Sequence, residues 1–447
     1  MAHIWGKRIG AAGLATVLTL SVAACGGQNA GNEPSAVPAQ GGSEGAGTEV
    51  LEVWLPAKAT DGNDAEIWDE VVAPFEEEHN VDVTFQFISW KDYEAKYSSG
   101  ISTGTGPDVG YMYVEMFPTY IDAGAVEDLS SYLTEEDYAT YTTLTDKYKI
   151  FGKFYGIAQS GPQAVSGLVY NKTILDSIGE EAPKTWDDVI RIAQKATQDT
   201  DGDGKIDQYG VAQGWGQTFY QDLNWNWYNF IWQAGGDIFD DEGKCIINNE
   251  QGIAAAQLLY DLKNTYHALP EDAMSLINNE AFDNYFVSGK AALSFVGTSE
   301  STFNKLADAG FEYGFTYDLQ GPNGDMGARA SVDQIVLMSA CEDKELGWEL
   351  VKYMTGPEGG AKYRELTGSA PSTVGEEDHG YAVTKEALAA SLDTSIRPIK
   401  AARRATEVYD FLWKTLQEMM NGNVSPEDAM NEVAEFANSL DYAAPAN

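Results

Sequence analysis

Cysteine and histidine are scarce in this 447-residue chain, with three and four copies. No histidine lies near a cysteine, which argues against a zinc site. Apart from Cys25 there are only Cys245 and Cys341. These two could pair, but we expect both to be buried free thiols that pack as small apolar side chains.

Positive charge is also scarce, since 28 Lys and Arg against 69 Asp and Glu give a formal net charge of -41. Such a surface repels phosphate backbones, which disfavours nucleic acid as a partner. No Gly-x-Ser-x-Gly elbow, P-loop or Gly-x-Gly-x-x-Gly motif follows directly after a predicted strand. We therefore expect no catalytic residues, although the many carboxylate pairs leave a glycosidase open.

Long apolar runs are absent beyond the N-terminal region, so we expect no transmembrane helix. Lys7 and Arg8 precede an apolar stretch at 9–24 that is typical of a signal peptide. Residues 22–26 read Val-Ala-Ala-Cys-Gly and resemble the bacterial lipobox, in which Cys25 is lipidated after cleavage. An ordinary signal peptide cut near Ala24 is the alternative. Residues 25–48 are rich in Gly, Ala, Ser and Pro and predict a flexible tether, so we expect a lipid-anchored protein at the extracellular face of the membrane.

Strand and helix patterns alternate from Glu49 onward. Residues 50–55, 81–87 and 108–112 predict strands, and 67–78 and a segment from about 92 predict helices. Strands separated by helices indicate βαβ units and a largely parallel sheet, which binds ligands at the carboxyl ends of its strands. Because about 400 residues exceed one core, we expect two α/β lobes.

Candidate ligand contacts follow these strands. A sugar offers hydroxyls to planar polar groups and a C–H face to an aromatic ring. Polar or aromatic side chains suited to such contacts occur in three places. They are Lys58, Trp90, Tyr113 and Glu115 after the three strands; Trp215 and Trp225 in the densest aromatic segment; and Arg329 and Asp333 before a strand at 334–338. Arg329 and Asp333 either line the cleft or pair with each other. Tyr228, Phe230 and Trp232 predict a helix that packs in the second lobe.

Ten short motifs share a common order along residues 49–440. They are Phe75–Val83, Gly106–Val109, Ala123–Val126, Gly152–Ile157, Val169–Lys172, Pro183–Asp188, Trp232–Asp237, Phe286–Ala292, Trp348–Thr355 and Ser425–Ala429. Their order and spacing resemble the family 1 extracellular solute-binding proteins of bacterial ABC importers, which include the maltose- and multiple-sugar-binding proteins.

The resemblance implies a type II, periplasmic-binding-protein-like α/β fold with a mixed sheet in each lobe and closure by hinge bending. We expect the first lobe at 49–160 plus about 319–370, the second at about 161–318 plus 371–447, and a hinge near Gln159 to Ala164. The implied function is that of a monomeric substrate-binding lipoprotein that delivers a carbohydrate, an oligosaccharide in particular, to its permease. A peptide or polyamine ligand, or a secreted carbohydrate-active enzyme, are the alternatives.

The same resemblance implies further site residues. Glu115 sits where the family's carboxylate accepts sugar hydroxyls, and Gln163 lies in the hinge segment. Many sugar binders have Trp just after the glycine that corresponds to Gly297, whereas this chain has Thr298 and Ser299. Thr298 therefore becomes the candidate contact there, and we expect a ligand of different shape.

An EF-hand-like loop begins at Asp199. Oxygen ligands for Ca²⁺ would come from Asp199, Asp201, Asp203, Asp207 and the backbone carbonyl of Lys205, with Gly204 allowing the turn. Position 12 is Gly210 instead of Glu, so this is not an intact EF-hand. Related loops in the family imply Gln208 as the completing ligand. We predict one structural Ca²⁺ here, and a solvated polar turn is the alternative.

Overall fold

The computed structural model describes residues 49–440 except 59–61, 165, 217–219, 241–242, 381–384, 387–389 and 392–393. From Thr48 onward the chain forms one compact unit. The predicted signal peptide, the tether and Cys25 lie outside the described residues. None of the described helices combines the length and the apolar character that crossing a bilayer requires.

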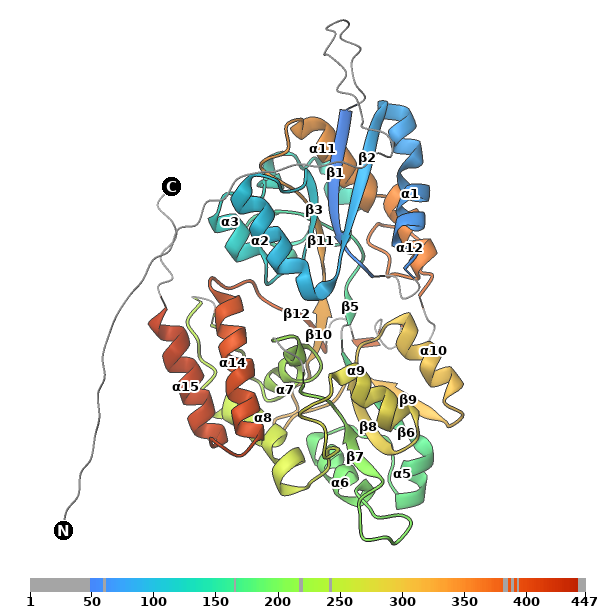
Figure 1. The fold of residues 1–447 in the computed structure, drawn as a ribbon, viewed down its shortest axis with the longest axis vertical. Coiled ribbons are helices and arrows are strands. Elements are labelled where there is room, and N and C mark those ends of the chain that lie inside the picture. The colour runs from blue at the N-terminus through green and yellow to red at the C-terminus, as the bar shows by residue number, and fades with distance from the viewer. Residues whose placement is uncertain are drawn as a thin grey trace, which may run out of the picture. The chain divides into compact units, whose positions relative to one another are not determined.

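The first lobe contains a five-stranded sheet of order β2-β1-β3-β11-β4 (Figure 1). Its strands are β1 (Glu49–Pro56), β2 (Val81–Ile88), β3 (Val109–Met112), β4 (Ile157–Ala158) and β11 (Gln334–Leu337). β1 runs parallel to β2 and β3, as the alternation of strands and helices predicts, whereas β11 pairs antiparallel with β3 and β4. The carboxyl ends of β1, β2 and β3 therefore lie at one edge.

Helices cover this sheet. They are α1 (Asp64–His79), α2 (Tyr93–Thr103), α3 (Phe117–Asp122), α4 (Glu135–Thr140), α11 (Lys344–Thr355) and α12 (Gly359–Thr367), with short helical turns η1 (Trp90–Asp92), η2 (Leu129–Ser131) and η3 (Asp146–Tyr148). α1, α11 and α12 pack on one another (Figure 1). α2 ends at Gly104, whose φ of 68° is a left-handed conformation that glycine adopts without strain.

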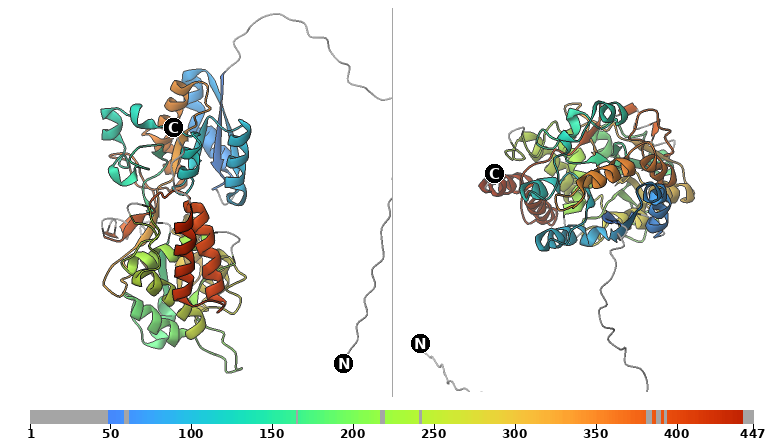
Figure 2. Two further views of the ribbon diagram at one scale, coloured as in Figure 1. Left: turned by 90° about the vertical axis from the view of Figure 1, so that its left-hand side faces the viewer. Right: turned by 90° about the horizontal axis from the view of Figure 1, so that it is seen from above.

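The second lobe is built on a four-stranded sheet of order β7-β8-β6-β9. These strands are β6 (Gly167–Asn171), β7 (Tyr209–Ala212), β8 (Ala291–Val296) and β9 (Tyr313–Thr316). The surrounding helices are α5 (Lys172–Ile178), α6 (Trp186–Ala196), η4 (Tyr220–Asn224), α7 (Trp227–Gln233), α8 (Glu250–Tyr260), η5 (Asp261–Thr265), α9 (Asn278–Ala281), η6 (Phe282–Val287), α10 (Glu300–Asp308), α14 (Ala405–Met420) and α15 (Pro426–Ser439). α14 and α15 pack side by side (Figure 2), and α15 also packs on α8. The predicted aromatic helix is α7, and Tyr228, Phe230 and Trp232 are buried in this lobe.

A small three-stranded sheet of order β12-β10-β5 joins the lobes (Figure 1). It consists of β5 (Gln163–Ala164), β10 (Ala328–Ser331) and β12 (Ile396–Pro398). Leu319 still packs in the second-lobe core, so the chain returns to the first lobe later than the predicted boundary, after β10. Residues 372–376, in contrast, bind first-lobe groups. The chain therefore crosses between the two lobes at this sheet.

Both Cys245 and Cys341 are buried and free, as the sequence predicts. Cys245 packs in the second-lobe core and Cys341 in the first. Burial raises the pKa of Cys245 to about 11, so this thiol stays protonated and unreactive at neutral pH.

Candidate functional site

Aromatic side chains gather where the first-lobe strands end. Trp90 begins η1 just after β2 and is 36% exposed. Its ring centroid lies 6.1 Å from that of Tyr111 and 6.3 Å from that of Tyr113, both of which come from β3 or its end. The Tyr113 hydroxyl donates to Glu94 of α2, which holds the ring in place. These rings offer an exposed aromatic plane beside the polar groups described next.

Lys58 follows β1, and its ammonium group lies beside the aromatic ring of Tyr111. Its Nζ donates to Gln159 Oε1 at 2.6 Å and lies 4.2 Å above the Tyr111 ring. This enclosure lowers the pKa of Lys58, while the carboxylates of Asp333 and Asp64 oppose the shift. Because the residue as a whole remains exposed, water moderates the effect.

Glu115 and Arg329 form a buried ion pair between the first lobe and the joining sheet. Glu115 follows β3 and is 3% exposed, and Arg329 lies in β10 and is 4% exposed. Arg329 Nη2 lies 3.2 Å from Glu115 Oε1, although the residues are 214 positions apart. Burial raises the pKa of Glu115, and the Arg329 charge opposes that shift. Glu115 Oε2 and Arg329 Nε have no hydrogen-bond partner within the part of the chain that the structure describes.

Asp333 is held by hydroxyls instead of by Arg329. Its carboxylate accepts from Tyr111 and from Ser331, and its carbonyl accepts from the backbone N–H of Gln159 at 3.0 Å. Among the described residues no ion pair joins Asp333 to Arg329, so the alternative in which these two pair with each other is not formed. Burial and the neighbouring Asp333 raise the pKa of Tyr111 well above its ordinary value.

The junction cluster is our name for Lys58, Tyr111, Glu115, Gln159, Arg329 and Asp333. Its members combine a charge-balanced set of donors and acceptors with the Trp90 aromatic plane, which is the chemistry that a polyhydroxylated ligand requires. Sequence reasoning did not select Tyr111 or Gln159. The position of Gln159 in the expected hinge was the available signal, because a hinge residue faces both lobes.

The remaining predicted contacts lie in the second lobe or at the joining sheet. Trp215 is completely buried in the second-lobe core, and Trp225 is half-buried near the start of α7. Thr298 follows β8 and hydrogen bonds to Tyr317, which packs against the joining sheet. The side chain of Gln163 lies outside the described residues.

The Asp199 loop gathers three of its predicted ligands. Carboxylate oxygens of Asp199, Asp201 and Asp207 lie within 4.8 Å of one another. Gly202 and Gly204 have φ of 81° and 89°, which allows the loop to fold back on itself. Asp203 instead accepts from the backbone N–H of Lys205 at 2.8 Å. Gln208 donates to the Ala196 carbonyl at 2.9 Å, so its amide is directed away toward α6. Three convergent carboxylates fit the ligand preference of Ca²⁺.

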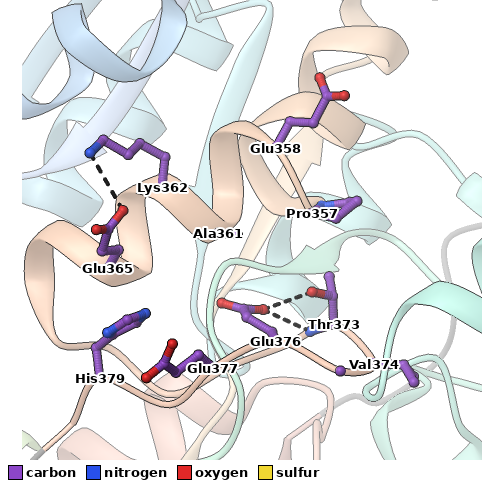
Figure 3. A pocket seen from close by; sticks show the side chains of 11 residues that line it. Pro357, Glu358, Ala361, Lys362, Glu365, Thr373, Val374, Glu376, Glu377 and His379 are labelled. Carbon is purple, nitrogen blue, oxygen red and sulfur yellow. Dashed lines mark hydrogen bonds and ion pairs between the residues drawn. The ribbon is translucent and has the colours of Figure 1, made fainter.

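A surface hollow lies between α12 and the segment at 373–379 (Figure 3). Its central carboxylate, Glu376, accepts from the hydroxyl and backbone N–H of Thr373 and from the buried Arg364. Lys362 on its rim pairs with Glu365 and Glu70. Because these polar groups are already engaged within the protein, we assign the ligand site to the junction cluster.

The sequence profile of the bacterial extracellular solute-binding proteins matches residues 59–361. The chain belongs to this family. This solute-binding protein is 24% identical over 436 residues to the galactooligosaccharide-binding protein of Bacillus subtilis, and the match covers 95% of each chain. Membership implies an extracellular or periplasmic location and a role in solute binding and transport.

Solved structures with the same fold are two-lobed. An ABC substrate-binding protein of Listeria monocytogenes in complex with cycloalternan has a TM-score of 0.71 at 22% identity, covering 88% of this chain and 98% of that one. The maltose/maltodextrin-binding domain of Bdellovibrio bacteriovorus bound to maltotriose has a TM-score of 0.69 at 19% identity, covering 87% and 98%. The predicted family and two-lobed α/β fold are confirmed.

Proposed function

We propose that this solute-binding protein captures a carbohydrate, an oligosaccharide in particular, at the junction cluster and hands it to an ABC permease without converting it. The observation that carries this proposal is the meeting of Trp90, Lys58 and the Glu115–Arg329 pair at the carboxyl edge of the first sheet. An aromatic plane and paired donors and acceptors match the two faces of a sugar. The names of the relatives, which bind galactooligosaccharides, cycloalternan and maltotriose, support the same class.

Calorimetry of the protein without its N-terminal 48 residues tests this function. Galactotriose, maltotriose, spermidine and a tripeptide are titrated separately, and each mixture is then examined for reaction products. We expect one trisaccharide to bind in a 1:1 ratio and to be recovered intact. Trp90→Ala should weaken that binding about tenfold, whereas Tyr138→Ala, at an exposed aromatic residue of the same lobe, should not. Released product, or binding of spermidine or peptide alone, would sink the proposal.

We also propose that the mature chain begins at a lipidated Cys25 and stays at the outer face of the membrane. The basic residues, the apolar stretch and the lipobox-like sequence before Cys25 support this anchor. Cys25→Ala is expected to move the protein from the membrane fraction to the medium when cells are fractionated. An unchanged membrane fraction would rule out lipid attachment at this residue.

A structural Ca²⁺ held by Asp199, Asp201 and Asp207 is the third part of the proposal. Three carboxylates this close repel one another unless a cation neutralises them, so bound Ca²⁺ stabilises the folded state. Excess chelator should lower the melting temperature by a few degrees, and added Ca²⁺ should restore it. An Asp199→Asn/Asp201→Asn variant should melt at one temperature with or without chelator. If the unmodified protein melts at the same temperature with and without chelator, the proposed calcium site is wrong.

A further inference from the structure

Gln159 is a buried residue in the segment that leads from β4 toward the joining sheet, and three of its groups are hydrogen-bonded. Its backbone N–H donates to the Asp333 carbonyl at 3.0 Å, and its Oε1 accepts from Lys58 Nζ at 2.6 Å. Its backbone carbonyl accepts from Arg364 Nη1 at 2.8 Å. Gln159 therefore connects the Lys58 ammonium of the junction cluster to a residue that lies 205 positions further along the chain.

Arg364 of α12 cannot touch a ligand, because it is completely buried. Its guanidinium joins three segments of the first lobe. Besides Gln159, it donates to the carbonyls of Thr355 and Gly356 at the end of α11 and to the carboxylate of Glu376. The N–H groups of a guanidinium point in fixed directions within one plane, so Arg364 fixes where the Gln159 carbonyl lies relative to α11.

A second hydrogen bond restrains the same segment. The backbone N–H of Gly161 donates to the Ala370 carbonyl at 2.9 Å. A Cβ atom at Gly161 would collide with the carbonyl oxygen of Pro371, so the two backbones approach this closely only because the residue is glycine. Residues 159–161 are therefore held at both ends, and the direction of the Gln159 side chain follows from that fixed backbone.

The buried ion pair of Arg364 with Glu376 is costly for a purely structural link. Taking two charges out of water costs free energy, and well-packed apolar side chains often stabilise a fold as well or better. A guanidinium differs from an apolar side chain because its directional N–H groups place several carbonyls at once. The arrangement thus favours a role in placing the Gln159 carbonyl over a role in stability alone.

Lys58 depends on such placement because its ammonium sits at the end of a flexible aliphatic stem. The Gln159 Oε1 acceptor and the Tyr111 ring, whose centroid lies 4.2 Å from Nζ, hold the ammonium in one place. The charged groups that face it are the carboxylates of Asp333 and Asp64. Enclosure lowers the pKa of Lys58 to about 8, so the titration of this amine reports whether the side chain is held.

We propose that Arg364 is a positioning residue of the ligand site: it fixes the backbone of Gln159, whose amide then holds the Lys58 ammonium ready to donate to a bound solute. A residue that never touches the ligand thereby sets the affinity for it. The effect on affinity rests on the proposed function of the junction cluster, whereas the link from Arg364 to Lys58 is measurable without ligand.

An NMR titration of Lys58 tests this link on the protein without its N-terminal 48 residues. Lysine is labelled with ¹³C at Cε, and the resonance that disappears in Lys58→Arg identifies Lys58. Arg364→Lys keeps a buried cation but offers one ammonium in place of the planar fork. The pKa of Lys58 should therefore rise from about 8 toward its ordinary value as the side chain is released. Glu376→Gln weakens the same anchor with less disturbance and should cause a smaller rise.

Leu129→Ala, at a buried residue of the first-lobe core, is the matched control for lost stability. It should lower the melting temperature and leave the Lys58 titration unchanged. An unchanged or lowered pKa of Lys58 in both Arg364→Lys and Glu376→Gln would overturn the positioning role. If Arg364→Lys does not fold, the Glu376→Gln titration decides.

A double-mutant cycle measures the consequence for binding. Calorimetry gives the affinity of Arg364→Lys, Lys58→Met and the double variant for whichever of galactotriose and maltotriose binds more tightly. Arg364→Lys should weaken binding about tenfold, and should have no further effect once Lys58 is replaced. Equal effects of Arg364→Lys in both backgrounds would overturn the proposal. Failure of both saccharides to bind the unmodified protein would overturn the proposed function and the effect on affinity, whereas the Lys58 titration would still decide the link from Arg364.

Discussion

Arg364→Met is expected to lower the free energy of unfolding by about 3–5 kcal/mol. Arg364 is completely buried, and its Nε and Nη2 donate to the Glu376 carboxylate. Its Nη1 donates to the carbonyls of Gln159 at 2.8 Å and Thr355 at 3.0 Å, and Nη2 donates to the Gly356 carbonyl at 3.1 Å. Methionine fills the space but removes the cation beside the Glu376 carboxylate, which keeps its Ser372 and Thr373 donors, and it takes the Arg364 donor from the Gln159 and Thr355 carbonyls. Urea denaturation measures the loss.

A double variant distinguishes the contribution of the Arg364–Glu376 ion pair to stability from the contribution of side-chain packing. Arg364→Met/Glu376→Met should recover part of the lost stability, because removing both partners leaves no buried charge. Arg191→Met, at a half-exposed arginine paired with Glu180 and Asp188, is the matched surface control and should cost about 1 kcal/mol or less. A loss at Arg364 no larger than that at Arg191 would contradict this role.

Glu115→Ala is expected to weaken saccharide binding about a hundredfold and to destabilise the fold as well. From sequence alone we expect the fold to be unaffected, but the structure pairs Glu115 with the buried Arg329. Alanine leaves that guanidinium unpaired, which costs about 3–5 kcal/mol when the charge is enclosed. Calorimetry at a temperature where the variant remains folded measures the affinity, and thermal denaturation measures the stability.

Two control variants accompany Glu115→Ala: one removes only the charge at this position, and the other removes a carboxylate elsewhere. Glu115→Gln retains the shape and one acceptor and should lose less stability than Glu115→Ala. Glu127→Ala removes a less buried partner of Lys344 and should leave affinity unchanged. Undiminished saccharide affinity in folded Glu115→Ala would remove this residue from the ligand site.

Local patterns predict much of the fold. Strict alternation at 81–87 anticipates β2, and the apolar spacing at 67–78 anticipates α1, which begins three residues earlier at Asp64. Both elements depend on contiguous residues, so their periodicity is visible in the chain itself. Trp215 shows the limit of such reading. Its neighbours Gly214 and Gly216 allow close packing against the backbone at 275–277, a contact that the local sequence does not reveal.

The sequence by itself determined the order of the elements, the family and the acidic loop at Asp199. Each of these depends on short runs of consecutive residues, which can be recognised without knowing the fold. Only the tertiary structure decided that Arg329 pairs with Glu115 and that Lys58 meets Gln159 across 101 positions. These contacts depend on how the sheets order their strands and on where the chain crosses between lobes. No local periodicity encodes that geometry, since it arises only when distant segments pack together.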